Sequence, residues 1–171
     1  YESKINEKWE YVVDLESKGL MEAVREVMVS YGFDWFVFFK AGDVFFKDSL
    51  ISFVNELAST PKFCNVVYGD LMVDLQFYGR PVFNIDGFLS NPYINMSYYF
   101  FRADVFSVLE SFPAVSGDSL TIWLAIKVLE EFGVNSFGHV DLPLVSSSVN
   151  QWKTDDVEYK SILLEHLRKR G

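Results

Sequence analysis

Apolar residues along the first part of the chain change between a strand-like and a helix-like spacing. The segment 9–15 (WEYVVDL) predicts a short strand, whereas residues 20–31 place apolar side chains three and four positions apart, as one stripe of a helix does. A glycine ends this helix, and 33–39 (FDWFVFF) is then apolar at nearly every position. A strand covered on both faces has this composition, so the pattern favours a layered α/β sheet.

The same alternation continues after residue 39. Residues 50–57 again show helical spacing, with Asp48 or Ser49 predicted to cap the helix and Pro61 predicted to stop it. A further strand follows at 65–68 (NVVY). This βαβα order predicts a mostly parallel sheet flanked by helices.

The second half of the chain predicts shorter elements and mixed additions at the edge of the sheet. The pattern gives a loop or hairpin around Gly79, an irregular stretch, a strand, two helices, a strand and a terminal helix. In order, these lie at 73–81, 83–92, 94–102, 103–111, 120–132, 134–140 and 155–170. No internal repeat or low-complexity linker divides the sequence, so we expect one α/β domain over 1–171.

Composition and charge narrow the possible functions. With 171 residues and 50% hydrophobic content, the chain can bury a proper core. The net charge of −9 argues against a general nucleic-acid binder, which needs clustered Lys and Arg to neutralise phosphates. No apolar run reaches the roughly 18 residues of a membrane span, and the single cysteine, Cys64, favours a buried thiol in a reducing compartment. We therefore expect a soluble, cytoplasmic protein.

Three aspartates stand where ligands bind in sheets of this kind. Asp43, Asp70 and Asp118 follow predicted strands or precede a predicted helix, and ligands lie beyond the carboxyl ends of the strands in open α/β sheets. The chain has no cysteine pair, no histidine cluster and no Gly-x-Gly-x-x-Gly, so zinc, thiol and dinucleotide chemistry lack support. Carboxylates suit Mg²⁺ or Mn²⁺, which bridge the phosphates of a nucleotide. Each aspartate could instead only form a turn or cap a helix.

A set of short motifs resembles a known enzyme family. In chain order they read GLMEAVR, FFKAGD, FKDSL, NVVYGD, SGDSLTIWL and HVDLPL, at 19–25, 38–43, 46–50, 65–70, 116–124 and 139–144. Their order and spacing over 19–145 resemble the latter part of a GT-A-fold, family 2-type glycosyltransferase. The resemblance implies a GT-A sheet and the transfer of a sugar from a nucleotide-diphosphate donor to an acceptor hydroxyl on a glycan, protein or lipid.

The same resemblance implies roles for individual residues. Asp43 corresponds to the last acid of the family's metal-binding motif, and Asp118 corresponds to the general base of inverting enzymes. Lys40 and Gly42 stand where the family has two further acids. Asp43 is therefore expected to hold Mn²⁺ or Mg²⁺ weakly, and Lys40 could take over part of the cation's work against the leaving diphosphate.

Arg25 and Asp70 receive supporting roles from the resemblance. Arg25 falls at the helix position that faces the nucleotide, where it could pair with a phosphate, and Asp70 could act toward the donor sugar or the acceptor. The family's first βαβ unit, which binds the nucleobase, has no clear counterpart before Trp9. The nucleotide site is therefore either reduced or completed by upstream sequence.

Two other interpretations stay open from the sequence. The reduced acidic motif is consistent with a GT-A-like domain that has lost catalysis and serves as a binding or assembly module. The second alternative is a nucleotidyltransferase on a similar α/β sheet. The enzyme hypothesis requires Asp43 and Asp118 to face one cleft, within about 10 Å of each other, because a sugar must fit between metal and base.

Overall fold

The computed structural model describes residues 32–39, 42–90, 98–108, 117–147 and 156–170. The chain divides into two compact units, Tyr1–Phe33 and Asp34–Gly171, and the fold given below is that of the second unit. The predicted strand at 9–15 and the predicted helix at 20–31 lie outside the described residues.

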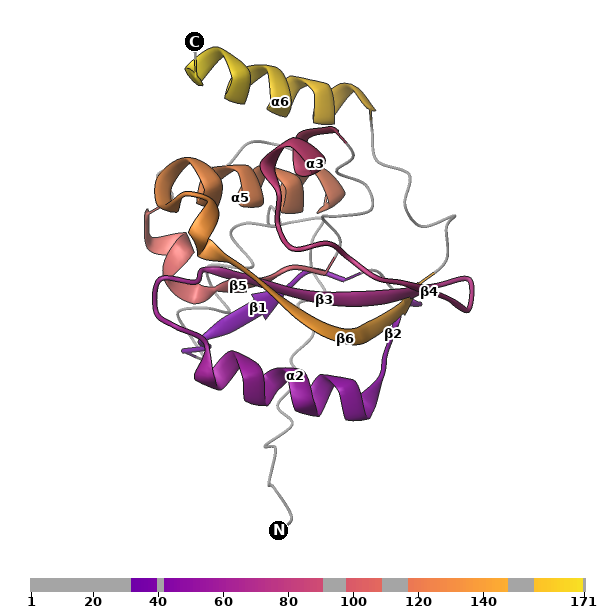
Figure 1. Ribbon diagram of the computed structural model, residues 1–171. Helices are drawn as coiled ribbons and strands as arrows, with labels where there is room; N and C mark the ends of the chain where they lie inside the picture. The colour runs from indigo at the N-terminus through magenta and orange to yellow at the C-terminus, as the bar shows by residue number, and fades with distance from the viewer. Residues whose placement is uncertain (1–31, 40–41, 91–97, 109–116, 148–155, 171) are drawn as a thin grey trace, which may run out of the picture. The chain divides into compact units, whose positions relative to one another are not determined.

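Six strands of the second unit form one mixed sheet (Figure 1). They are β1 (Trp35–Val37), β2 (Val44–Phe45), β3 (Val66–Val73), β4 (Gln76–Tyr78), β5 (Phe100–Arg102) and β6 (Phe137–Ser147). Their order across the sheet is β1-β5-β3-β6-β2, and β4 pairs with β3 off this path. Among the described strands, β3 and β6 pair in parallel, and the other four pairings are antiparallel.

The α/β class is thus confirmed, but the prediction of a mostly parallel sheet is wrong for the described strands. Parallel neighbours need a long crossover, and the connection from β3 to β6 contains one. β4 follows β3 through a two-residue turn, which can join only antiparallel strands. The remaining strands β1, β2 and β5 are only two or three residues long. Each of them pairs antiparallel: β1 with β5, β5 with β3, and β2 with β6.

Helices cover both faces of the sheet (Figure 1). α2 (Lys47–Ser59) lies against one face, and α3 (Ile85–Ser90) and α5 (Gly117–Phe132) lie over the other, with α6 (Asp156–Arg170) packed on α5. Short 3₁₀ turns occur at 103–108 and 134–136. None of the helices in the described part of the chain is long and apolar enough to span a membrane.

The α-helices follow the sequence prediction with two differences, apart from the helix predicted at 103–111, where the structure has a 3₁₀ turn at 103–108. α2 begins after Phe46, which is its N-cap and makes no side-chain capping bond, so the predicted caps Asp48 and Ser49 lie inside the first turn. There the negative charge of Asp48 still interacts favourably with the positive, N-terminal end of the helix dipole. The second difference is α3, a short helix in a stretch predicted to be irregular.

The face of the sheet under α2 is apolar. Phe53 and Leu57 of α2 are buried in one cluster with Val67 and Leu71 of β3. The two β3 residues share this face because side chains alternate along a strand. Cys64 lies in the same cluster as a free, buried thiol, as the sequence predicted, and burial raises its pKa.

β3 is longer than predicted and changes the place of a candidate residue. The strand runs through Asp70 to Val73, so Asp70 lies inside the sheet and not in a loop after it. The hairpin that follows turns at Asp74 and Leu75, whose φ angles of 45° and 66° are left-handed, and not around Gly79. Two successive left-handed residues match the twist of a two-residue hairpin, so no glycine is used at this turn.

Candidate functional site

One group of polar side chains gathers at the carboxyl end of the parallel pair β3–β6. Asp43 immediately precedes β2, and Ser147 is the last residue of β6, beside Val44 and Ser146, which are paired across the two strands. The hydroxyl of Tyr98 donates a 2.6 Å hydrogen bond to Asp43 Oδ2 and shares a 2.9 Å hydrogen bond with Ser147 Oγ. Tyr98 therefore holds the Asp43 carboxylate in place, and Ser147 at the end of β6 in turn fixes the Tyr98 hydroxyl.

This group offers oxygen ligands only. A carboxylate and two hydroxyls suit a hard divalent cation such as Mg²⁺ or Mn²⁺. Asp43 and Tyr98 are more than half buried, so their bonds are little screened by water. These oxygen atoms are therefore suitable ligands for Mg²⁺ or Mn²⁺, the ions that the sequence analysis expected at Asp43.

The other predicted site residues do not all fall within the described part of the chain. Arg25 and Lys40 lie outside the described residues. Asp118 lies in the first turn of α5, but its side chain is outside the described part. Whether Asp43 and Asp118 share a cleft therefore stays a prediction, and so do the roles of Arg25 and Lys40.

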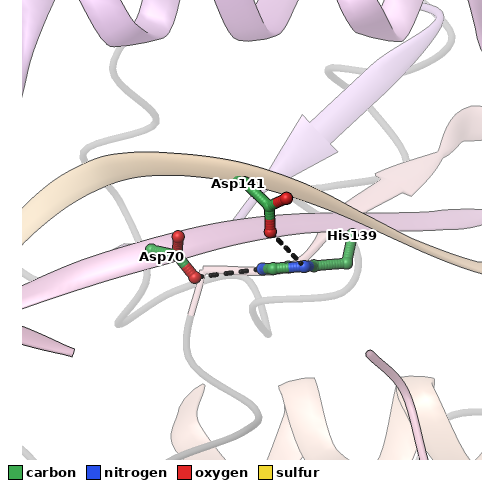
Figure 2. Close-up of side chains that lie close together, drawn as sticks. All are labelled: Asp70, His139 and Asp141. Carbon is green, nitrogen blue, oxygen red and sulfur yellow. Dashed lines mark hydrogen bonds and ion pairs between the residues drawn. The ribbon is translucent and has the colours of Figure 1, made fainter. Parts of the chain in front are cut away.

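A second polar group lies within the sheet, on the face opposite α2. It consists of Asp70 on β3 with His139 and Asp141 on β6, and Figure 2 shows the imidazole ring between the two carboxylates. His139 Nε2 lies 3.0 Å from Asp70 Oδ1 in a hydrogen bond, and His139 Nδ1 lies 3.2 Å from Asp141 Oδ1. The side chains of Asp70 and His139 are only 6% and 7% exposed, whereas that of Asp141 is 95% exposed. The group is thus buried at one end and open at the other.

An irregular pairing of β3 with β6 brings these three residues together. Tyr68 pairs with His139, but Asp70 pairs with Pro143, so β6 carries two extra residues between these points. Such bulges bend a strand and redirect side chains, and they occur often beside functional sites. Without the extra residues, Asp141 would be the residue opposite Asp70.

Gly69 allows this close approach of β6. A Cβ atom on Gly69 would lie 2.7 Å from the carbonyl oxygen of Leu142 and 2.7 Å from the side chain of Leu144. Real side chains do not reach such distances, so any other residue would push the two strands apart. The glycine of the motif NVVYGD is therefore explained by packing at the bulge.

A buried arginine supports Asp70 from the third side. The backbone N–H of Arg80 donates a 2.7 Å hydrogen bond to Asp70 Oδ1, and the guanidinium group donates to the carbonyl of Gly69 at 3.2 Å. The guanidinium carbon lies 4.5 Å from the ring centre of Tyr68 and 4.8 Å from that of Tyr99. Two aromatic faces and a carbonyl thus compensate a charge that is almost fully buried.

Burial governs the protonation of this cluster. It lowers the pKa of Arg80, although the charge of the guanidinium is favoured by Tyr99, Tyr68 and Asp70. It raises the pKa of Tyr68, and it raises the pKa of Tyr99 to about 12 despite the nearby guanidinium. Both tyrosines are therefore neutral at physiological pH and present their rings to the cation.

The sequence prediction missed His139 and Arg80 as site residues. The chain has no histidine cluster, and the two carboxylates beside His139 come from two strands, one of them 69 positions away. The signal that could have found His139 is the run His139-Val140-Asp141, which can direct two metal-ligand side chains to one face of a strand.

A separate groove lies at the other end of the parallel pair. It has a volume of about 650 Å³ and is lined by Phe63, Val82, Phe83, Phe132, Val134, Asn135, Ser136 and Phe137. None of these side chains is titratable, and Phe137 is the first residue of β6, whereas Ser147 is the last. The groove is thus uncharged, lined mainly by apolar side chains together with Asn135 and Ser136, and distant along β6 from Asp43.

Comparison with solved structures places the fold in a class. No protein-family model matches the sequence, and no curated protein has a significant sequence match to it. Solved glycosyltransferase structures are similar to the chain at low sequence identity, and this likeness supports a GT-A-like fold with a mixed sheet and flanking helices.

The particular structures are those of glucosyl-3-phosphoglycerate synthase from Mycobacterium tuberculosis. The complex with Mn²⁺, UDP-glucose and phosphoglyceric acid has 14% identity and a TM-score of 0.50, with 87% of this chain and 55% of that chain covered. The complex with Mn²⁺, UDP and glucosyl-3-phosphoglycerate has 13% identity, a TM-score of 0.51 and the same coverage. The complex with phosphoglyceric acid alone has 14% identity, a TM-score of 0.51, and coverage of 85% and 54%.

These likenesses concern the fold. At 13–14% identity they carry no residue-by-residue correspondence, and this chain spans about half the length of the synthase. They agree with the GT-A fold that the motif resemblance implied, and they leave the family 2 assignment as an expectation.

Proposed function

We propose that this chain is a glycosyltransferase domain that uses a nucleotide-diphosphate sugar with the help of a divalent cation. The observation that carries the proposal is the position of Asp43 at the carboxyl end of β3 and β6, where Tyr98 binds it and is itself bonded to Ser147. Ligands of open α/β sheets lie at this end. Support comes from the GT-A-like fold and from similar structures that contain Mn²⁺ and UDP-glucose.

In the proposed reaction, the acceptor oxygen forms a bond to the anomeric carbon as the bond from that carbon to the nucleotide diphosphate breaks. Mn²⁺ or Mg²⁺, when bound, would neutralise charge on the diphosphate. Asp43 would hold the ion, and Tyr98 would orient the Asp43 carboxylate through its hydrogen bond. Lys40 would add a positive charge toward the leaving diphosphate.

Asp118 is the proposed general base. It would accept the proton of the acceptor hydroxyl, which makes the oxygen a better nucleophile. Its position in the first turn of α5 favours the ionised carboxylate, because the N-terminal end of a helix is positive. An ionised carboxylate is ready to accept a proton, although the same field makes it a weaker base.

Two residues are assigned supporting roles, Asp70 toward the donor sugar or the acceptor and Arg25 toward the donor's phosphates. Arg25 would pair with a phosphate. Both described hydrogen bonds of Asp70 use Oδ1, so a contact with donor sugar or acceptor would be made by Oδ2.

Calorimetric titration with UDP-glucose and other UDP- and GDP-sugars, with and without Mn²⁺, tests the donor and metal part of the proposal. We expect Mn²⁺-dependent heat with wild type and at least a tenfold weaker affinity for Asp43→Asn, because the variant keeps the side-chain shape but loses the charge. Asp104→Asn, an exposed carboxylate in the turn at 103–108, is the charge-matched control. No metal-dependent heat with any donor would favour the binding or assembly module instead.

Release of UDP from UDP-glucose tests the base. Asp118→Asn should bind the donor as wild type does but turn it over about 10²–10⁴ times more slowly, the usual contribution of a general base. Equal loss of donor affinity and turnover would instead assign Asp118 to donor binding. Unchanged turnover would exclude it as the base.

A further inference from the structure

The second polar group brings a ring nitrogen of His139 to 3.2 Å from an exposed carboxylate, a pair of atoms that a proton or a metal ion can bridge. A carboxylate can only accept hydrogen bonds, so the 3.0 Å bond to Asp70 places a proton on His139 Nε2. In the neutral ring, Nδ1 then carries a lone pair, and this atom lies 3.2 Å from the negative carboxylate of Asp141. That contact is an ion-pair distance and not one of the described hydrogen bonds of the ring.

The arrangement is that of a metal-binding histidine before its ion. Histidines that bind metals commonly donate their other ring N–H to a carboxylate, which fixes the ring and the tautomer. Asp70 provides this carboxylate, and it is itself fixed by the backbone N–H of Arg80 at 2.7 Å. The ring of Tyr68 lies 5.0 Å from the imidazole, centre to centre, and supports it from one side.

The separation of the two outer atoms also fits an ion. Two ligand atoms at about 2.1 Å from one cation lie roughly 3.0–3.4 Å apart when they subtend a right or tetrahedral angle. The observed distance from Nδ1 to Asp141 Oδ1 is 3.2 Å. The exposure of Asp141 leaves room on this side for water molecules to complete the coordination.

We propose that His139 Nδ1 and Asp141 bind a divalent cation on the face of the sheet opposite α2, with Asp70 as the positioning residue. An imidazole nitrogen with a carboxylate favours Zn²⁺ or Co²⁺ over Mg²⁺, which prefers oxygen ligands. The site is separate from the oxygen-only group at Asp43 and goes beyond the proposed transferase function. With two protein ligands, it binds its ion more weakly than a three-ligand zinc site.

The test is an NMR titration of the whole chain with Zn²⁺ and with Co²⁺ as probes. The sequence contains two histidines, His139 and His166, so their ring signals are simple to follow. His166 is 1% exposed and bonded to Glu130, and it serves as an internal control. We expect Zn²⁺ to shift and Co²⁺ to broaden the His139 signals, with His166 unchanged and with no displacement by excess Mg²⁺.

Variants separate this site from the one at Asp43. Asp141→Asn should abolish the effect of both ions and, because the side chain is 95% exposed, should keep the fold and the other NMR signals. Asp70→Asn should weaken binding about 10–100-fold, the usual effect of losing a carboxylate that orients a metal-binding histidine. Asp43→Asn and Asp104→Asn should bind Zn²⁺ as wild type does.

Three results would overturn the inference. His139 signals that do not respond to Zn²⁺ at millimolar concentration would exclude the site. Unchanged binding by Asp141→Asn would exclude this ligand pair, and loss of Zn²⁺ binding in Asp43→Asn would assign the ion to the other group. Failure of UDP-glucose to bind would leave the inference unaffected, because the titration contains no nucleotide.

Discussion

The two faces of β3 show how one strand serves two purposes. On the face toward α2, Val67 and Leu71 join Phe53 in a cluster of apolar side chains. On the other face, Tyr68 and Asp70 are equally buried but polar, and each has a defined hydrogen-bond partner. Burial of apolar surface stabilises the first face without directional bonds, whereas each polar group on the second must be matched by a partner.

The difference indicates that the apolar face stabilises this unit, whereas the polar face carries its candidate functional groups. Burying Arg80 with Asp70 and His139 gives little net stabilisation, because desolvation opposes the attraction between charges. The apolar face must therefore supply the free energy that keeps the polar face in one arrangement. Substitutions on the two faces should differ in size and in what they affect.

The largest effect is expected on the apolar face. Phe53→Ala removes a side chain with 0% exposure from the centre of the α2 contact, and it should lower the free energy of unfolding by about 3–5 kcal/mol. Urea denaturation followed by fluorescence measures this change. Val54→Ala, at the next position and 47% exposed, is the control and should stay within about 0.5 kcal/mol of wild type. Equal losses in both variants would contradict the account of this face.

A smaller effect is expected from the hydroxyl of Tyr99 on the polar face. Tyr99 hydrogen-bonds the buried guanidinium of Arg80, and Tyr99→Phe keeps the ring but removes this bond, at a cost of about 1.5–3 kcal/mol. Tyr68→Phe removes a 2.7 Å bond to the uncharged carbonyl of Pro81 and should cost about 0.5–1.5 kcal/mol. The same denaturation experiment compares the two. A larger loss of unfolding free energy in Tyr68→Phe than in Tyr99→Phe would show that the hydrogen bond to the Arg80 charge is not the more important of the two.

The junction of the two faces can be tested at Gly69. Gly69→Ala would place a Cβ against Leu142 and Leu144, and the resulting strain should cost about 1–3 kcal/mol and move the bulge. Gly87→Ala, whose Cβ would meet only the side chain of Asn84 at 3.7 Å, is the control and should be neutral or slightly stabilising. Chemical shifts of His139 report the bulge directly. A tolerated Gly69→Ala with unchanged His139 shifts would show that the close approach is not required.

The smallest effect concerns the pH dependence of stability at Glu130, where α5 contacts α6 above the polar face of the sheet. Burial opposes ionisation of Glu130, but hydrogen bonds from His166 and Lys127 outweigh it and lower its pKa below 4.5. A carboxyl with a lowered folded-state pKa contributes stability above pH 4.5, and this contribution is lost as the pH falls through the folded value. Glu130→Gln should therefore reduce the loss of thermal stability between pH 5 and pH 3, by less than about 1 kcal/mol for a solvent-screened group.

Glu131→Gln, the exposed neighbouring residue, controls for the change of charge alone. It should leave the acid sensitivity close to that of wild type. A larger effect of Glu131→Gln than of Glu130→Gln would mean that the bond from α6 to Glu130 does not decide the pH response.

Local pattern was sufficient for α2, α5 and α6 and for the position of Asp43, but it did not predict α3 or the 3₁₀ turn at 103–108. The spacing of apolar residues predicted α2, α5 and α6 to within a few residues at their ends, since helical periodicity is a property of neighbouring positions. The motif FFKAGD placed Asp43 just after a strand, and the structure has it between β1 and β2. Local pattern was not sufficient for the turn at Asp74 and Leu75, where two non-glycine residues adopt left-handed angles.

What the sequence by itself determined is the alternation of elements, the apolar core and the likeness to a GT-A enzyme. What only the tertiary structure decided is the direction in which the strands pair and which side chains meet. Tyr98 reaches Asp43 across 55 positions, and His139 reaches Asp70 across 69. The physical reason is that hydrophobic spacing specifies which face of an element is buried, whereas register and bulges specify its neighbours, and these depend on the packing of both strands at once.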